Sequence, residues 1–177
     1  MSTPVFNVLF LCTANSARSI MAESIIQREG RGRFRGFSAG SHPRGDVHPY
    51  AIELLRNLRH PVEGLHSKGT DSFLQGPEMD FVFTLCDLAA QEPCPVWPGH
   101  PMTAHWGMPD PAQVTGIESV RRHAFSDTYR MLLQRIGIFV NLPLATLDQM
   151  SLKRQVENIG TLPFTPTPHP ARTDAGA

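Results

Sequence analysis

The sequence has no excess of either charge and no long apolar stretch. Lys plus Arg and Asp plus Glu both number 16 among the 177 residues, so the chain lacks a basic field that would attract nucleic acid or an anionic membrane. No apolar stretch approaches the roughly 20 residues of a membrane span, and the N-terminal apolar run lacks the flank and cleavage site of a secretory signal. We therefore expect one well-cored domain that is not exported, with a small molecule or a protein as its partner.

Cysteine is scarce as well. Cys12, Cys86 and Cys94 are the only three, an odd number spread widely along the chain. This pattern does not resemble the disulfide framework of a small secreted protein. We therefore expect a cytoplasmic protein in which at least one cysteine works as a free thiol.

Apolar runs that suit strands alternate with stretches of helical periodicity. Strands are predicted at 5–11, 34–38, 81–85 and 103–106, and helices from Ser16, at about 49–58, at about 118–140 and at 147–158. Asp46 is a possible cap of the second helix. The inner stripe predicted for the long helix comprises Val120, Ala124, Thr128, Met131, Leu132, Ile136 and Phe139. The alternation predicts an α/β fold, a flavodoxin-like four-stranded parallel sheet in the order 2-1-3-4 with helices on both faces.

The predicted elements divide the chain into three parts. Residues 1–140 form the main domain, and residues 141–160 add a helical extension. From 161 to 177 the chain is rich in proline and small residues, so we expect a disordered tail. Four prolines between 93 and 101 exclude a regular helix there, and the third and fourth strands are expected to be joined by a loop.

The junction between the first strand and the first helix, residues 12–19, is the most informative part of the chain. Unpaired backbone N–H groups and the positive end of the helix dipole favour both a thiolate at Cys12 and a bound tetrahedral oxyanion. Arg18 can hold two oxygens with its planar fork, and Ser19 can donate its hydroxyl to the Cys12 sulfur. The alternative is a buried cysteine that only packs at a strand end. The expected oxyanion-binding residues are Thr13, Ala14, Asn15, Ser16, Ala17, Arg18 and Ser19.

Covalent attack by Cys12 on an oxyanion needs a proton for the departing oxygen and a way to regenerate the thiol. Asp110 lies in a proline-stiffened loop after the fourth strand and is the best candidate for the proton donor, although Asp-Pro is also a common turn signal. Cys86 directly follows the third strand, and residues 87–93 separate it from Cys94. These two thiols can carry the oxidation away from Cys12 by thiol–disulfide exchange.

In these motifs the sequence resembles the thiol-coupled arsenate reductases of the low-molecular-weight tyrosine phosphatase fold. The matching segments are FLCTANSARS at 10–19, MAE at 21–23, FSAG at 37–40, TLCD at 84–87, CP at 94–95, HW at 105–106 and DP at 110–111. The resemblance implies reduction of arsenate to arsenite, with Cys12 as nucleophile, Arg18 as oxyanion ligand, Asp110 as general acid and Cys86 with Cys94 as redox pair. We also expect no bound cofactor, phosphate or sulfate as competing oxyanions, and a monomer. The two downstream cysteines favour thioredoxin as the external reductant, with a glutaredoxin and glutathione system as the alternative.

Three positions depart from the pattern of that family. Ala14 stands where glycine is common, which matters little if the local φ is negative. The spacing from Cys86 to Cys94 is one residue longer than usual. Some members hold a potassium ion with residues that correspond to Asn15, Glu23 and Ser38 and with a downstream carboxylate. Lys68 fills the place of that carboxylate here, so we predict no ion and an ammonium group in its stead.

Three other functions are compatible with parts of the sequence. A tyrosine phosphatase would use Cys12, Arg18 and Asp110 alone, but Ala17 stands where those enzymes usually carry a second cysteine, and the residues after Pro111 include no aromatic pair. A structural zinc site would use Cys86, Cys94, His100 and His105, at a spacing wide for such a site. The third alternative is a module that binds oxyanions without chemistry.

Overall fold

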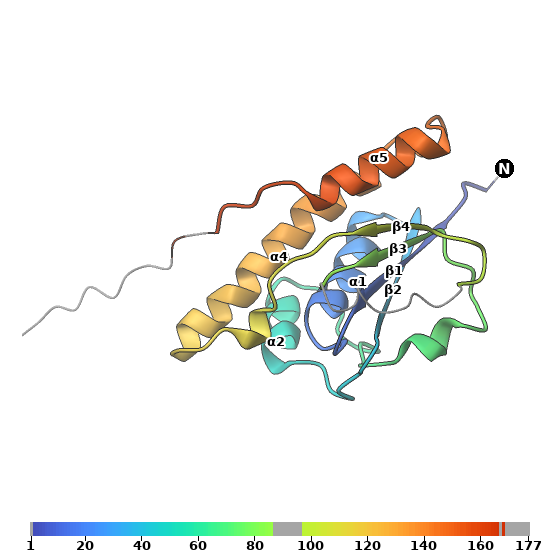
Figure 1. The fold of residues 1–177 in the computed structure, drawn as a ribbon. Helices are drawn as coiled ribbons and strands as arrows, with labels where there is room; N and C mark the ends of the chain where they lie inside the picture. Colours follow the sequence, from blue (N-terminus) through green and yellow to red (C-terminus); the bar gives the residue numbers. More distant parts are fainter. Residues whose placement is uncertain (1, 87–96, 167, 169–177) are drawn as a thin grey trace, which may run out of the picture.

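The computed structural model describes residues 2–86, 97–166 and 168, and its centre is a parallel sheet (Figure 1). The four strands are β1 (Phe6–Cys12), β2 (Phe34–Gly40), β3 (Phe81–Thr84) and β4 (Met102–His105). Their order is β2-β1-β3-β4, and all three neighbouring pairs are parallel. This confirms the predicted fold and sheet order, and it places β1 in the interior of the sheet.

Strand β1 is apolar on both faces because both faces of the sheet are covered. Val8 and Phe10 point into the main core, which also contains side chains of α1 and α4. Leu9 and Leu11 point to the opposite face, into a second cluster that includes Phe73 of the short 3-10 helix η1 (Thr70–Phe73). Continuous hydrophobicity of a strand is the expected mark of a sheet that is buried on both sides.

The helices begin and end near the predicted positions. They are α1 (Arg18–Glu29), α2 (Pro49–Asn57), α4 (Glu118–Val140) and α5 (Gln149–Gly160), with a second 3-10 helix η2 (Pro111–Gln113). The cap predicted for α2 is wrong. His48 takes that role, and its Nδ1 accepts a hydrogen bond from Tyr50 N at 3.1 Å. Imidazole is not among the usual capping side chains, which is why Asp46 was the more obvious choice.

The buried stripe of α4 is broader than its periodicity indicates. Four residues of the predicted stripe are buried, but so are Phe125 and Tyr129, which the prediction missed. Phe125 packs on His48 and Tyr50, and Tyr129 packs on His60. These partners lie on or near α2, so one-helix periodicity could not reveal the contacts.

Helix α5 covers the edge strand β4 (Figure 1). Trp106 Nε1 donates to Val156 O at 2.8 Å, and Val156 and Ile159 are buried in the main core. Residues 161–166 follow without helix or strand, and Leu162 still packs against this core. Residues 167 and 169–177 of the predicted tail lie outside the described residues. Within the described part of the chain, every helix is too short or too polar to cross a membrane.

Candidate active site

The loop of residues 12–17 lies at the carboxyl end of β1, between this strand and helix α1. Cys12 is the last residue of β1 and pairs with Gly40 of β2. A Cβ atom on Gly40 would lie 2.5 Å from Thr13 O and 2.9 Å from Asn15 N. Only glycine therefore lets the loop pack this closely against the neighbouring strand.

The loop carbonyls are tied to the segment that follows β2, which directs the loop amides inward. Four amides of the segment 41–48 donate to loop carbonyls: Ser41 to Cys12 at 3.2 Å, His42 to Thr13 at 2.9 Å, Arg44 to Ala14 at 3.1 Å and His48 to Ser16 at 2.8 Å. In a planar trans peptide the N–H group points opposite to the preceding carbonyl. The N–H groups of residues 13, 14, 15 and 17 therefore point to the other side, where they can form an anion-binding nest.

Helix α1 begins at this nest without a capping side chain. Ala17 occupies the N-cap position and makes no side-chain hydrogen bond there. The N–H groups of the first turn thus remain available to an anion. Asn15 has a left-handed φ of 46°, whereas Ala14 is absent from the positive-φ residues of the described chain. Replacement of glycine by Ala14 therefore causes no backbone strain.

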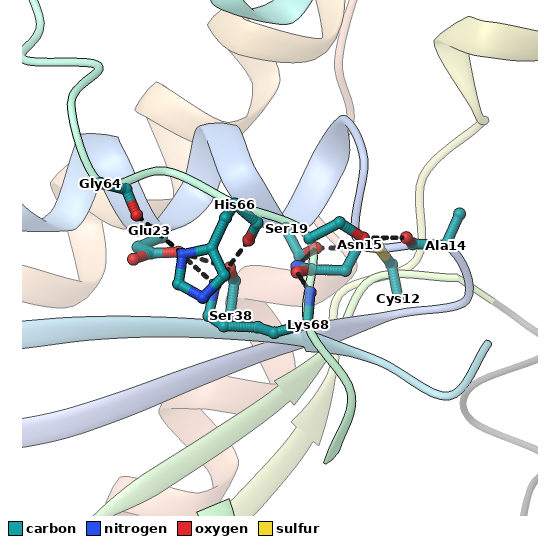
Figure 2. Close-up of polar contacts among 10 residues, drawn as sticks. Cys12, Ala14, Asn15, Ser19, Glu23, Ser38, Gly64, His66 and Lys68 are labelled. Carbon is teal, nitrogen blue, oxygen red and sulfur yellow. Dashed lines mark hydrogen bonds and ion pairs between the residues drawn. The ribbon is translucent and has the colours of Figure 1, made fainter. Parts of the chain in front are cut away.

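Ser19 connects the Cys12 sulfur to the amide side chain of Asn15 (Figure 2). Asn15 Oδ1 accepts the backbone N–H of Lys68 at 2.9 Å, which orients its Nδ2 toward Ser19 Oγ at 2.8 Å. Because Ser19 Oγ accepts that hydrogen bond, its own proton is available to Cys12 Sγ at 2.9 Å. A hydroxyl that donates to sulfur favours the thiolate over the thiol.

Lys68 places its ammonium group among oxygen atoms next to this chain of hydrogen bonds (Figure 2). Its Nζ lies 3.0 Å from Ser38 Oγ, 3.1 Å from His66 O and 3.4 Å from Glu23 Oε2, and Ser38 donates to the same carboxylate. The structure thus confirms that the Lys68 amine lies beside Glu23 and Ser38. Its positive charge compensates a carboxylate that is only 17% exposed.

Arg18 joins the loop to the segment that carries Asp110. Its Nη1 donates to Met108 O at 3.1 Å, and its Nη2 lies 3.4 Å from Asp110 Oδ2. Asp110 also caps η2 by accepting the Ala112 amide at 3.0 Å, so the turn role and the proximity to Arg18 coexist. The Asp110 side chain is 29% exposed and in reach of a bound molecule.

Cys86 reaches the same place from the end of β3. Its Sγ lies 3.2 Å from Thr13 Oγ1, and its side chain lines a cavity of about 470 Å³ together with Arg18 and Asp110. Cys12 is 3% exposed, and its loop neighbours Thr13, Ala14 and Ser16 line the same cavity. Cys94, the third predicted thiol, lies outside the described residues.

Sequence reasoning missed several residues of the cavity wall. Ala112 and Gln113 follow Asp110, while His42 and Arg44 come from the segment after β2. The carboxyl ends of parallel strands lie at the same edge of a sheet, so the position of His42 and Arg44 after β2 could have indicated that they lie near the loop. His48 lies in the same segment, and its burial, with Arg121 and Arg44 nearby, lowers its pKa.

The zinc alternative depends on Cys94 and therefore stays untested. His105 Nδ1 lies 2.8 Å from Thr84 Oγ1 on the neighbouring strand. Among residues 2–86 and 97–166, no three His, Cys, Asp or Glu side chains gather as metal ligands.

Fold and site together define a class of protein, a parallel α/β domain whose first strand delivers a cysteine to a loop of converging amides before a helix. Comparison with family models makes this specific. The model of the low molecular weight phosphotyrosine protein phosphatases matches residues 7–156, and the chain belongs to that family.

Curated relatives of the chain are arsenate reductases. The protein from Oceanobacillus iheyensis is 33% identical over 132 residues, which are 75% of this chain and 93% of that protein. The protein from Bacillus subtilis is 35% identical over 111 residues, 63% of this chain and 78% of that protein.

Solved structures with this fold include both types of enzyme. An arsenate reductase in its oxidized state has a TM-score of 0.62 at 25% identity, over 76% of this chain and 95% of that one. The tyrosine phosphatase Wzb from Escherichia coli K30 also has a TM-score of 0.62, at 18% identity, over 77% of this chain and 96% of that one. The fold alone therefore does not distinguish reduction from phosphate hydrolysis.

Proposed function

We propose that the protein is an arsenate reductase that converts arsenate to arsenite at the expense of thiols. The observation that carries the proposal is the meeting of two thiol-bearing segments at one cavity. The Cys12 loop forms one wall, and Cys86 lies 3.2 Å from Thr13 Oγ1 of that loop. Hydrolysis of a phosphate ester needs one cysteine that returns to its starting state, whereas reduction needs electrons from further thiols.

The first step is attack of the Cys12 thiolate on arsenic. The loop amides and the remaining N–H groups of Arg18 hold the oxyanion. A sulfur–arsenic bond forms, and one oxygen leaves as water after Asp110 has supplied a proton. The product of this step is a covalent adduct of Cys12 with arsenic still in the pentavalent state.

Two thiol exchanges complete the cycle. The Cys86 thiolate attacks Cys12 Sγ, the sulfur–arsenic bond breaks, and its electron pair reduces arsenic to the trivalent arsenite. Cys94 then attacks the Cys12–Cys86 disulfide, which restores the Cys12 thiolate and leaves a Cys86–Cys94 disulfide. Each exchange needs the Cα atoms of the two reacting cysteines within about 7 Å of each other.

The external reductant we propose is thioredoxin. A structural neighbour from Corynebacterium glutamicum, with a TM-score of 0.54 at 24% identity over 78% of this chain and 65% of that one, is a thioredoxin-dependent arsenate reductase. A disulfide between Cys86 and Cys94 is the type of product that thioredoxin reduces, whereas a glutathione and glutaredoxin system would suit a Cys12–Cys86 disulfide. Thiol chemistry of this kind needs a reducing compartment, so we propose that the protein is cytoplasmic. We further propose a monomer without a bound cofactor, in which phosphate and sulfate compete with arsenate for the loop.

The experiment compares multiple-turnover arsenate reduction in the wild type, Cys12→Ser, Cys86→Ser and Cys94→Ser. We expect Cys86→Ser to lose arsenate reduction but to keep any hydrolysis of an aryl phosphate, because only reduction uses the second thiol. Cys12→Ser should lose both activities. Unchanged arsenate reduction by Cys86→Ser would contradict the relay, and a harmless Cys94→Ser would assign the final exchange to the external thiol.

Tyrosine phosphatase activity is the second candidate, and the family model is the observation that favours it. The loop, Arg18 and Asp110 suit phosphoryl transfer, because phosphate and arsenate share shape and charge. The residues that follow Pro111 are Ala112 and Gln113, so the cavity lacks an aromatic pair there to grip a phenol ring.

A further inference from the structure

Arg135 on helix α4 is a buried cation without a carboxylate partner in the described part of the chain. It is 5% exposed, and its Nη1 donates to Trp106 O at 3.0 Å and to Gly107 O at 3.2 Å. Its Nε meets no acceptor among the described residues. Burial lowers the pKa of this guanidinium from its usual value. Among the described residues, the acceptors that bind this charge are two backbone carbonyls.

Such a contact is a poor way to stabilise a fold. Transfer of a guanidinium out of water costs free energy, and neutral carbonyls return less of it than a carboxylate would. A hydrophobic side chain of similar volume often serves stability equally well or better at such a site. We therefore expect Arg135 to act on the segment whose carbonyls it binds rather than on the stability of the fold.

These two carbonyls begin the segment that leads to Asp110. Trp106 is anchored by its amide to Thr84 O at 2.7 Å, and Met108 by its amide to Leu85 O at 3.1 Å. Arg18 then binds Met108 O and approaches Asp110. Arg135 holds the residues immediately before those that Arg18 contacts, so two guanidinium groups fix successive peptide units of one segment.

We propose that Arg135 is a positioning residue for Asp110, which it holds in place through the backbone of residues 106–108. The proposal rests on the proposed role of Asp110 as general acid, and Arg135 itself touches neither substrate nor Cys12. The Nη1 atom of Arg135 donates to both carbonyls, and the planar guanidinium keeps a fixed orientation between them. A lysine amine on its flexible stem would not keep that orientation. A general acid displaced by about 1 Å loses much of its effect.

The test combines Arg135→Met with Asp110→Asn and two aryl phosphates. We expect Arg135→Met to lower kcat for phenyl phosphate by about tenfold with little change in KM. The loss should be smaller for p-nitrophenyl phosphate, because its leaving group needs less help from an acid. In the Asp110→Asn background the same substitution should cost nothing further. Arg130→Met, an exposed arginine of the same helix, is the control and should match the wild type.

A structural role would give a different result. Equal losses for the two esters, or losses that add in the double variant, would overturn the proposal. Arg135→Lys keeps a cationic donor without the planar fork, should fold if the methionine variant does not, and should show the same leaving-group dependence to a smaller degree. The measured activity is ester hydrolysis, so the role of Arg135 can be tested even if the protein does not reduce arsenate. A failure of the proposed function would be seen in the arsenate reduction assay instead.

Discussion

Ser19 is the residue through which the surroundings act most directly on Cys12. Ser19→Ala removes the hydroxyl 2.9 Å from the sulfur, and a hydrogen bond to a charged group contributes about 1.5–3 kcal/mol. We expect alkylation of Cys12 by iodoacetamide at neutral pH to slow about tenfold or more, measured by mass spectrometry of the Cys12 peptide. Ser24→Ala is the control, because Ser24 lies on the same helix but bonds to His60. Equal alkylation rates in the wild type and Ser19→Ala would contradict this role.

Lys68 and Glu23 form a mostly buried pair, with side chains 12% and 17% exposed. Lys68→Met leaves the carboxylate without its cation and should lower the free energy of unfolding by about 1–3 kcal/mol. The double variant with Glu23→Gln should recover part of this loss, because neither charge is then left unpaired. Urea unfolding of the two single variants and the double variant measures the coupling. Strictly additive changes would show that the two side chains do not depend on each other.

Residue types and spacing predicted the loop well but not the contacts around it. The Cys12 to Ser19 contact follows from their positions at the end of β1 and in the first turn of α1, on either side of one short loop, so the sequence contains it. The orientation of Asn15 depends on the backbone of Lys68, 53 residues away. No local pattern encodes that contact, and only the resemblance to a family suggested that Lys68 was near.

At the scale of elements, two helical glycines should respond to alanine in opposite ways. A Cβ on Gly160 would lie 2.3 Å from His105 O and 2.7 Å from Trp106 Cδ1, whereas a Cβ on Gly137 meets nothing within 4 Å. Gly160→Ala should push α5 away from β4 and cost roughly 1–3 kcal/mol. Gly137→Ala should gain up to about 1 kcal/mol. Urea midpoints measure both, and a Gly160→Ala protein at least as stable as the wild type would refute the close packing of α5.

The cap of α2 makes stability depend on pH. Burial and nearby arginines lower the pKa of His48 below 6.5, and its Nδ1 accepts Tyr50 N only when unprotonated. The unfolded chain therefore binds a proton at His48 more readily than the folded chain does. The stability that the neutral His48 contributes above pH 6.5 is lost as the pH falls through its lower folded-state pKa. We expect the urea midpoint to fall less between pH 7.5 and 5.5 in His48→Asn, since asparagine caps without titrating.

A second histidine that titrates in the same pH range affects the wild type and the variant alike. Burial also lowers the pKa of His60, which titrates in both proteins, so the difference between them isolates His48. An identical pH dependence of the midpoint in the wild type and His48→Asn would show that the cap does not titrate.

Element positions were predictable where one helix or strand determines its own pattern. Helix α4 spans the predicted residues 118–140 because its periodicity and its apolar content agree. The burial of Phe125 and Tyr129 was not predictable, since it depends on His48, Tyr50 and His60 outside the helix.

At the scale of the whole molecule, the topology brings the chemistry together. Parallel strands end at one edge, so Cys12, Cys86 and the Asp110 segment meet although 98 positions separate the first from the last. The strand order 2-1-3-4 was enough to predict this meeting. The buried Arg135 was not predictable, because an arginine on a helix indicates a solvent-exposed face far more often than a pair of buried carbonyls.

The most direct test of the three-thiol account is disulfide mapping by mass spectrometry after one turnover with arsenate and no external reductant. We predict a Cys86–Cys94 disulfide in the wild type, none in Cys12→Ser, and a trapped Cys12–Cys86 disulfide in Cys94→Ser. Phosphate in place of arsenate should leave all three cysteines reduced. A Cys86–Cys94 disulfide that forms equally without Cys12 or without arsenate would contradict the account.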